Sequence, residues 1–466
     1  MPDSRPDPVP DPVLDPVLAR VDDTLPQALQ RLMALLRIPS ISTDPAHAAD
    51  CEAAADWLVQ DLRDMGFEAA KHATPGRPIV VGTAGEGRPL LFYGHYDVQP
   101  VDPLALWRRP PFDPRIEDAP QGQVIRGRGA SDDKGQLMTF VEAARAWRAV
   151  HGALPARVTM FFEGEEESGS PSLVPFMEAH RDLLRADLAL ICDTGLFDRD
   201  TPAITTQLRG LVGEALTVTG PRMDLHSGTY GGAARNPIRV LARILASLHD
   251  EDGRVTLPGF YDGVPEPSHA QKAQWGALGF DESRFLGDVG LSVPAGERGR
   301  SVLEATWARP TCEFNGIAGG YAGDGFKTVL PSKAHAKVSF RLVGAQDPER
   351  VAAAFRQRVR DLLPPDCAVE FHPHGGAPAS VMDTSSPAFE AARLALSAEW
   401  PRPAAFTGSG GSIPIAGLFK SILGMDAMLV GFALDDDLIH SPNEKYDVRS
   451  FHKGIRSWVR ILRALA

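Results

Sequence analysis

Hydrophobic residues in the first part of the chain alternate between two spacings. Some segments repeat apolar residues at the 3.6-residue period of an amphipathic helix, and short apolar runs typical of buried strands lie between them. The helical pattern covers residues 24–36, 48–65, 136–150 and 172–180, and the strand pattern covers residues 79–82, 90–93, 157–162 and 188–192. Alternating helices and strands predict an α/β fold.

The pattern changes at residues 210–219, where apolar and polar residues alternate as in a strand with one buried face. There follow a helix at 236–248, a Gly- and Pro-rich stretch to about residue 299, a strand at 334–342, a helix at 348–363 and a strand at 368–371. From about residue 384 the first pattern returns, with a strand at 428–432 and a final helix at 451–465. We therefore expect one domain made of residues 23–206 and 383–466, and a second domain, residues 207–382, inserted into it.

The chain is long enough for two domains and begins with an unusual segment. It has 466 residues, of which 43% are hydrophobic, whereas a single core rarely exceeds about 250–300 residues. Residues 1–22 repeat Asp-Pro and Pro-Val units, which disfavour a packed element, so we expect a flexible tail. The absence of a signal-peptide pattern and of a long apolar stretch leads us to expect a cytoplasmic protein.

Charge and cysteine content exclude several classes of partner and site. Acidic residues outnumber basic ones by 60 to 48, and the net charge of -12 argues against nucleic acid or a membrane as partner. A small molecule or a short peptide fits better. The four cysteines are far apart in the sequence, so neither a disulfide framework nor a zinc knuckle is predicted.

Residues that can bind metal ions follow the predicted strands. His95 and Asp97 come directly after the strand at 90–93, and α/β folds place their sites at the C-terminal ends of strands. Asp97 lies two residues beyond His95, on the same side of an extended chain, where it would hydrogen-bond the imidazole and orient it. Taken alone, a histidine at a strand end is only a weak sign of a metal site.

Two acidic motifs lie further along the chain. Asp132 and Asp133 end a glycine-rich turn before the helix at 136–150. Helix capping would explain Asp132, but a carboxylate also has two oxygens that can bridge two metal ions. Four glutamates occupy the five positions 163–167 directly after a buried strand, where carboxylates are costly unless cations neutralise them. One glutamate of this group can bind a metal while its neighbour stays free as a base.

Two more candidate ligands follow strands later in the sequence, Asp193 after residues 188–192 and His440 after residues 428–432. With His95, Asp132 and Glu167 they provide two imidazoles and three carboxylates. This set suits Zn, Mn or Co and does not suit a metal that prefers thiolates. If one carboxylate bridges two ions, each ion has three protein ligands.

Five motifs occur in a specific order along the chain, and four of them contain His95, Asp132, Glu167 and His440. The motifs are GHYDVQP, GRGASDDKG, EGEEESGS, DLHSGTYGG and HSPNEK. With them, the chain from about Thr24 to its C-terminus resembles the co-catalytic metallopeptidase family that includes carnosinases, cytosolic non-specific dipeptidases, carboxypeptidase G, aminoacylase and succinyl-diaminopimelate desuccinylase. The resemblance implies a catalytic domain with a central mixed, mostly parallel sheet flanked by helices, and an inserted α+β lid and dimerisation domain.

The resemblance also implies a role for each candidate residue at the centre. Two metal ions per subunit, Zn or Mn with Co as a further option, would be bound by His95 and Asp193, by Glu167 and His440, and by Asp132 as the bridge. Glu166 would be the general base, which takes a proton from a water molecule between the ions and passes it to the leaving amine. Asp97 would orient His95.

Further residues of the family pattern concern the substrate and a partner subunit. The resemblance implies a homodimer in which His226 reaches into the partner's site and stabilises the oxyanion. Arg341 would bind a substrate carboxylate, for which its planar guanidinium is suited. Thr328 and Ser412 match positions that line the substrate site, and the glycines before Ser412 allow close approach of the backbone.

Finer features favour a dipeptidase that cleaves dipeptides or short peptides. These are the motifs DVQP, EESGS and GRGASDDKGQ and the long segment 248–307. An N-acyl amino acid amidohydrolase or a glutamate-type carboxypeptidase with the same site is the alternative. A binding protein of this fold would be expected to lack a ligand or Glu166, and none is missing. Glu165 replaces the apolar residue frequent in similar dipeptidases, and its charge would raise the pKa of Glu166.

His372 and His374 form a second histidine pair near the strand predicted at 368–371. They match no site position of the family. Because Pro373 between them indicates a strand end or an edge strand, we expect two surface histidines rather than metal ligands.

Overall fold

A computed structural model describes residues 10–411 and 413–466. The chain forms two compact units. The first contains residues Met1–Thr206, Met382–Phe406 and Leu418–Ala466, and the second contains residues Gln207–Val381 and Thr407–Gly417. Residues 1–9, which hold part of the predicted tail, and Ser412 lie outside the described residues.

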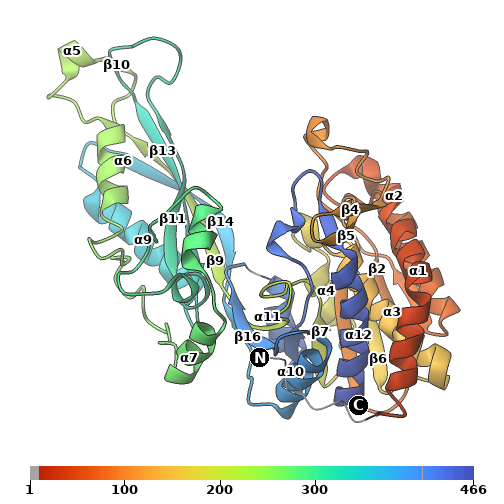
Figure 1. Ribbon diagram of the computed structural model, residues 1–466. Coiled ribbons are helices and arrows are strands. Elements are labelled where there is room, and N and C mark those ends of the chain that lie inside the picture. The colour runs from red at the N-terminus through yellow and green to blue at the C-terminus, as the bar shows by residue number, and fades with distance from the viewer. Residues whose placement is uncertain (1–9, 412) are drawn as a thin grey trace. The chain divides into compact units, whose positions relative to one another are not determined.

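The first unit is built around a mixed sheet (Figure 1). The strand order is β1 (Glu68–His72), β2 (Ile79–Ala84), β6 (Arg157–Glu163), β3 (Pro89–His95), β7 (Leu188–Ile191), β17 (Asp426–Leu429), β8 (Ala203–Leu208) and β15 (Ser380–Val381), and β16 (Ala405–Ser409) also pairs with β8. The first unit holds this sheet from β1 to residue 206 of β8, whereas β15 and the last residues of β8 and β16 belong to the second unit. The four central strands β6, β3, β7 and β17 are parallel. The other pairs for which a direction is given are antiparallel, so the predicted mixed sheet is confirmed and its parallel part is central.

Helices pack on this sheet through their apolar faces, which bury many residues in the longer helices. The main ones are α1 (Asp15–Leu36), α2 (Ala48–Asp64), α3 (Lys134–His151), α10 (Pro387–Glu399) and α12 (Val448–Leu465), and the short α4 (Leu173–Ala179) and α11 (Pro414–Leu423) lie between strands in the sequence. In the core, Phe140 of α3 stacks on Phe92 of β3 with ring centroids 3.8 Å apart, and Trp458 of α12 packs edge-on against both. Contacts between these aromatic rings therefore pack α3 and α12 against the central strand β3.

The first helix starts earlier than the sequence pattern predicts. We expected a flexible segment to residue 22 and a helix from residue 24, but α1 begins at Asp15. Val17, Leu18 and Val21 are buried, and Pro16 lies in the first turn, where a missing N–H costs no helical hydrogen bond. Burial of these three apolar residues therefore outweighs the local effect of the prolines.

A small sheet, which the sequence did not predict, joins distant segments of the first unit. Strand β5 (Gly122–Arg126) pairs on one side with β4 (Arg115–Ala119) and on the other with β18 (Lys445–Asp447), both antiparallel. The loop 127–133 follows β5 directly, and residue 444 precedes β18. The pairing therefore brings the motif GRGASDDKG next to the motif HSPNEK.

The second unit is an antiparallel sheet covered by helices on one face. The strand order is β11 (Thr311–Gly319), β13 (Lys333–Leu342), β9 (Gly210–Thr219) and β14 (Ala368–Ala377). Helices α6 (Pro237–Ala246) and α9 (Pro348–Leu362) pack on the face whose side chains are buried, where Leu216, Phe340 and Phe355 belong to one core (Figure 1). β11 and β14 are edge strands, and β14 carries His372 and His374 on its exposed part, as Pro373 indicated.

Shorter elements complete the second unit. Strand β10 (Leu225–His226) pairs with β12 (Val329–Leu330), and the short helix α5 (Ser227–Tyr230) follows β10. The Gly- and Pro-rich stretch contains two helices that we did not predict, α7 (His269–Ala277) and α8 (Glu282–Gly287). Trp275 is the only buried residue of α7, so the stretch has no apolar periodicity to detect. Within the described residues, no helix is long and apolar enough to cross a membrane.

Candidate metal centre

Three parallel strands end at the same edge of the large sheet and bring their last residues together. His95 is the last residue of β3 and lies opposite Glu163, the last residue of β6. Asp193 follows β7 by two residues. Because the strands are parallel, their C-terminal ends share one edge, where α/β folds form their sites.

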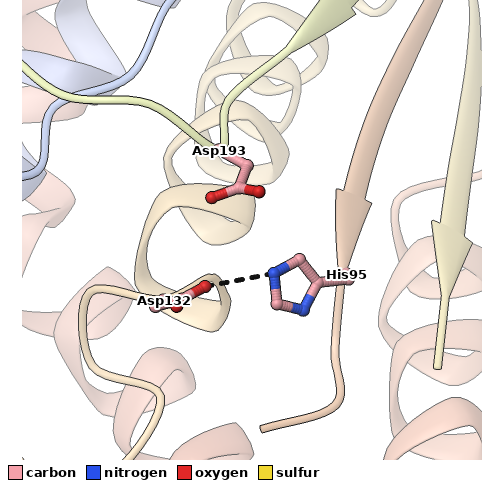
Figure 2. A group of neighbouring side chains, drawn as sticks. All are labelled: His95, Asp132 and Asp193. Atoms are coloured by element: carbon pink, nitrogen blue, oxygen red, sulfur yellow. Dashed lines mark hydrogen bonds and ion pairs between the residues drawn. The ribbon is translucent and has the colours of Figure 1, made fainter. Parts of the chain in front are cut away.

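Asp132 lies between two imidazoles. Its Oδ1 is 3.1 Å from Nε2 of His95, and its Oδ2 is 2.9 Å from Nε2 of His440. The residue stands in the turn between β5 and α3, and its peptide bond to Asp133 is cis. Figure 2 shows His95, Asp132 and Asp193 pointing toward one another from three separate segments. The two oxygens of one carboxylate therefore face two different groups of ligands.

The five residues predicted as metal ligands form two overlapping groups. The first group is His95, Asp132 and Asp193, the second is Asp132, Glu167 and His440, and within each group the ligand atoms lie within 4.8 Å of one another. Asp132 belongs to both. All five lie in the first unit, although residues 95 and 440 are far apart in the sequence.

The residues of the two groups fit divalent cations. Oε1 of Glu167 is buried, and it forms an ion pair with Nε2 of His440 at 3.3 Å when that ring is protonated. Burial, followed by the charge of Asp132, raises the pKa of Asp193 well above its ordinary value. A buried carboxylate is ionised most easily next to a cation. The two imidazoles and three carboxylates also match the hard-to-borderline ligands preferred by Zn or Mn.

The surroundings of His440 and His95 favour the protonated, positively charged form of each imidazole. Hydrogen bonds to Asp132 and Glu167 raise the pKa of His440 to about 10. Burial lowers the pKa of His95, but hydrogen bonds to Asp132 and Asp97 more than offset it, and the net shift is strongly upward. A histidine must be neutral to bind a metal ion, so cation binding here would release protons.

Asp97 contacts both the candidate ligand His95 and the loop of the candidate base. Its Oδ1 is 3.4 Å from Nδ1 of His95. The same carboxylate accepts hydrogen bonds from the backbone N–H groups of Glu166, at 3.2 Å, and of Glu167, at 3.0 Å. Asp97 is fully buried. It is therefore placed to hold an imidazole and the turn Glu166–Ser168 in a fixed relation.

Glu166 lies beside the two groups of ligands, and Glu165 points away from them. Burial raises the pKa of Glu166 to about 6, the charge of His95 opposes this shift, and the charges of Glu167, Asp97 and Asp132 add to it. The carboxylate of Glu165 instead accepts hydrogen bonds from the backbone N–H groups of Arg77, at 2.9 Å, and Ser172, at 3.1 Å. Glu165 thus anchors a neighbouring loop.

His226 and Thr328 are neighbours in the second unit. Nδ1 of His226 accepts hydrogen bonds from the backbone N–H groups of Gly228, at 3.1 Å, and Thr229, at 3.3 Å. Nδ1 is therefore the acceptor, and Nε2 carries the proton in the neutral ring. The carbonyl of Thr328 accepts a hydrogen bond from Ser227 N–H at 3.0 Å. His226 is exposed, so its Nε2–H is a donor available to a group from outside.

Arg341 is half-buried on β13, and a second arginine lies near it. Burial and the charge of Arg341 lower the pKa of Arg209 to about 10. Arg209 donates hydrogen bonds to the carbonyls of Gly410, at 3.3 Å, and Ala305, at 3.5 Å. Our sequence analysis missed Arg209, because a single arginine between two strands carries no local signal. The predicted residue Ser412 lies outside the described residues.

Asp133 is a further residue at the centre that sequence reasoning did not single out. Its Oδ2 accepts a hydrogen bond from the backbone N–H of His95 at 3.1 Å. Asp133 is fully buried, and burial raises its pKa to about 7. The acidic pair thus has two separate tasks, since Asp132 faces the imidazoles and Asp133 holds the strand end of His95.

Two overlapping groups of residues that could hold metal ions lie at the edge of an α/β sheet, an arrangement that suits a metal-dependent hydrolase. Residues 91–464 match Peptidase family M20/M25/M40, and the chain belongs to this family.

Individual relatives are similar over nearly the whole chain. The Cys-Gly metallodipeptidase dug1 of Schizosaccharomyces pombe is 30% identical, over 96% of this chain and 97% of its own length. The structure of human carnosine dipeptidase 1 matches with a TM-score of 0.82 and 25% identity, covering 98% of this chain and 99% of that one. Sso-CP2, an M20 family metallo-carboxypeptidase from Sulfolobus solfataricus, matches with a TM-score of 0.81 and 30% identity, covering 94% and 99%.

Proposed function

We propose that this chain is a dipeptidase with two divalent metal ions in its active site. The observation that carries the proposal is the position of Asp132, whose two carboxylate oxygens each face one imidazole, His95 on one side and His440 on the other. Asp193 and Glu167 complete the two groups of ligands. Similarity to a Cys-Gly metallodipeptidase and to carnosine dipeptidase 1 supports dipeptides as the substrate.

Glu166 is the general base of the proposed reaction. When bound, the two ions would lower the pKa of a water molecule and polarise the peptide carbonyl. Glu166 takes a proton from the attacking water and later gives it to the leaving amine, and burial, which raises its pKa, makes it a better proton acceptor than an exposed carboxylate. Asp97 keeps Glu166 in place through the backbone N–H at 3.2 Å.

His226 and Arg341 act on the substrate. The Nε2–H of His226, fixed by the two hydrogen bonds to Nδ1, donates to the oxyanion that forms at the peptide carbonyl in the site of the partner subunit. Arg341 binds the free carboxylate of the substrate, and Arg209 adds a second positive charge near it. Thr328 and Ser412 belong to the same substrate site.

A homodimer follows from this role of His226, and exposed apolar side chains of the second unit support it. Edge strand β11 exposes Phe314 and Ile317, the latter with 62% of its surface accessible. Met223, Tyr230 and Phe326 are also exposed in this unit. An edge strand with apolar side chains is a favourable surface for a second copy of the chain.

Two further properties belong to the proposal. Zn and Mn accept the same set of ligands, with Co as a further option, and the metal available in the cell decides which is bound. A cytoplasmic location is supported by Cys51, Cys192, Cys312 and Cys367, which are free thiols, as is usual in a reducing compartment.

A carboxypeptidase or an N-acyl amino acid amidohydrolase is the second candidate. It is favoured by the 30% identity to the metallo-carboxypeptidase Sso-CP2. These activities use the same centre and differ in the group on the amino side of the scissile bond. A dipeptidase requires a free amino group there, whereas the alternatives accept a blocked one.

The test is hydrolysis of free dipeptides and of the same dipeptides with an acetylated amino terminus, by metal-loaded protein. We expect turnover of the free dipeptides and at least about 100-fold less of the acetylated ones, as for loss of a buried charged contact. Equal or faster turnover of the acetylated substrates would assign the chain to the alternative. No turnover of either set would contradict both.

A further inference from the structure

We propose that Glu444 is a positioning residue of the metal centre, which fixes the loop that carries Asp132 to the segment that carries His440. The inference rests on the proposed metal centre and assigns to Glu444 no contact with the ions or the substrate. It concerns how ligands from distant parts of the sequence reach their places together.

The small sheet brings Glu444 to the loop. In the antiparallel pair of β18 and β5, Lys445 lies opposite Arg126. Glu444 precedes β18 and Gly127 follows β5, and the N–H of Gly127 donates to the carbonyl of Glu444 at 3.0 Å. Glu444 is also only four residues beyond His440. One short segment thus supplies a ligand and reaches the loop of another.

The carboxylate of Glu444 accepts four hydrogen bonds, all from this loop. Oε1 accepts from the backbone N–H groups of Ser131, at 2.9 Å, and Asp132, at 3.0 Å. Oε2 accepts from the backbone N–H of Gly129, at 2.9 Å, and from Nη1 of Arg128, at 2.8 Å. Glu444 is fully buried. Three backbone donors on one carboxylate fix the course of the chain up to Asp132 itself.

A second connection runs in parallel with the first. The hydroxyl of Ser131 donates to Oδ2 of Asp437 at 2.8 Å. Nζ of Lys445 donates to Oδ1 of Asp437 at 2.7 Å. Asp437 is fully buried. The segment is therefore fixed on both sides of His440, three residues before it and four residues after it.

The hydrogen bonds of Glu444 and Asp437 are important because the packing and backbone conformation of His440 do not fix its position by themselves. The side chain of His440 is 53% exposed, so packing restrains it little. Its φ of 61° is rare for a residue other than glycine, and Leu438 and Asn443 have similar values. Such a conformation persists only where the surroundings impose it. Here the surroundings include the contacts of Glu444 and Asp437 with the Asp132 loop.

A purely structural role of Glu444 makes a different prediction, and Glu399 provides the matched control. Glu399 is a buried carboxylate of the same unit that accepts hydrogen bonds from Lys453, at 3.1 Å, Arg456, at 2.9 Å, and Arg460, at 3.0 Å. It contacts neither the Asp132 loop nor the His440 segment in any described interaction. Glu399→Gln therefore lowers stability without moving a ligand.

The experiment compares Glu444→Gln with Glu399→Gln by chelator competition with Zn²⁺ and with Mn²⁺ on the full chain. In Glu444→Gln the amide NH₂ faces loop donors, so we expect metal affinity to fall about 10- to 100-fold, as for other residues that orient ligands. Activity should return at excess metal. Glu399→Gln should keep its metal affinity within about twofold.

The results distinguish a failure of the positioning role of Glu444 from a failure of the proposed metal centre. Unchanged affinity in a folded Glu444→Gln variant, or an equal loss in Glu399→Gln, would overturn the positioning role. If wild-type protein binds neither ion, the proposed metal centre itself fails.

Should Glu444→Gln not fold, Ser131→Ala tests the second connection, with Ser457→Ala as control. Ser457 is a buried serine whose hydroxyl accepts a hydrogen bond from Trp400 Nε1 at 2.9 Å. We expect weaker metal binding in Ser131→Ala alone, by about 2- to 10-fold. Equal affinities in the two serine variants would contradict the inference.

Discussion

At the scale of the residue, the site depends on pairs of neighbours with different tasks. Asp132 faces two imidazoles while Asp133 holds the backbone of His95. Glu167 belongs to the second group of ligands while Glu166 lies outside both groups. Adjacent carboxylates on an irregular turn have different surroundings, so one short motif can supply both a candidate ligand and a candidate base.

If Glu166 is the general base, replacing it should lower turnover without lowering the metal content. Glu166→Gln keeps the size of the side chain and removes its ability to take a proton. We expect turnover of a dipeptide to fall by about 10²- to 10⁴-fold while the metal content stays at the wild-type value. Steady-state kinetics and elemental analysis of the same sample measure both. A variant with near wild-type turnover would remove Glu166 from the role of base.

The role of His226 predicts complementation between subunits. His226→Ala should lose about 10²- to 10³-fold in turnover, as when an oxyanion donor is removed. His335→Ala is the control, because His335 is an exposed histidine of the same unit whose Nδ1 contacts Thr217 Oγ1 at 2.9 Å. It should retain wild-type turnover.

Mixed dimers of His226→Ala with Glu166→Gln test whether His226 acts in the partner's site. Such a dimer contains one site with both residues intact if the histidine comes from the partner subunit. Activity should then recover in the mixture. A mixture as inactive as its two components would favour action within one subunit.

The sequence named the five candidate ligands but not the residues that hold them in place. The five stand at strand ends or in recognisable motifs, and the structure brings them into two groups that could hold metal ions. Arg209 and Glu444 act through contacts with residues far away in the sequence, at Gly410 and at Gly129–Asp132. Only the folded chain brings such pairs together. The orientation of Glu165 toward Arg77 is of the same kind.

At the scale of the element, periodicity succeeded where an element buries many of its residues on one face. The strand at 210–219 was predicted with the bounds of β9, in which buried and half-buried residues alternate without exception. Periodicity did not predict α7 or β4, because α7 buries one residue and β4 buries none. It also misplaced the start of α1, where the prolines masked three buried apolar residues.

At the scale of the element, we predict that edge strand β11 forms the contact between two copies of the chain. Ile317→Lys places a charge on the exposed edge strand proposed to face a second copy. We expect the protein to shift from dimer to monomer and to lose turnover with it, because His226 is then absent from the partner's site. Val293→Lys is the control, since Val293 is 75% exposed in the same unit but lies outside β11. Light scattering gives the mass, and a dimer unaffected by Ile317→Lys would exclude this edge.

At the scale of the whole molecule, the candidate metal centre and the candidate substrate-binding residues belong to different units. The first unit holds the five candidate ligands, Glu166 and Asp97, and the second holds His226, Thr328 and Arg341. An inserted unit can vary its loops without disturbing the sheet that orders the ligands.

The central claim is a centre of two metal ions joined by Asp132, and metal stoichiometry tests it most directly. Chelator-stripped protein is titrated with Zn²⁺ or Mn²⁺ while bound metal and dipeptide hydrolysis are measured together. The account predicts two ions per chain, activity that appears only with metal, and loss of tight binding of both ions in Asp132→Ala, because Asp132 belongs to both groups of ligands. Hydrolysis by metal-free protein, or two tightly bound ions in Asp132→Ala, would contradict it.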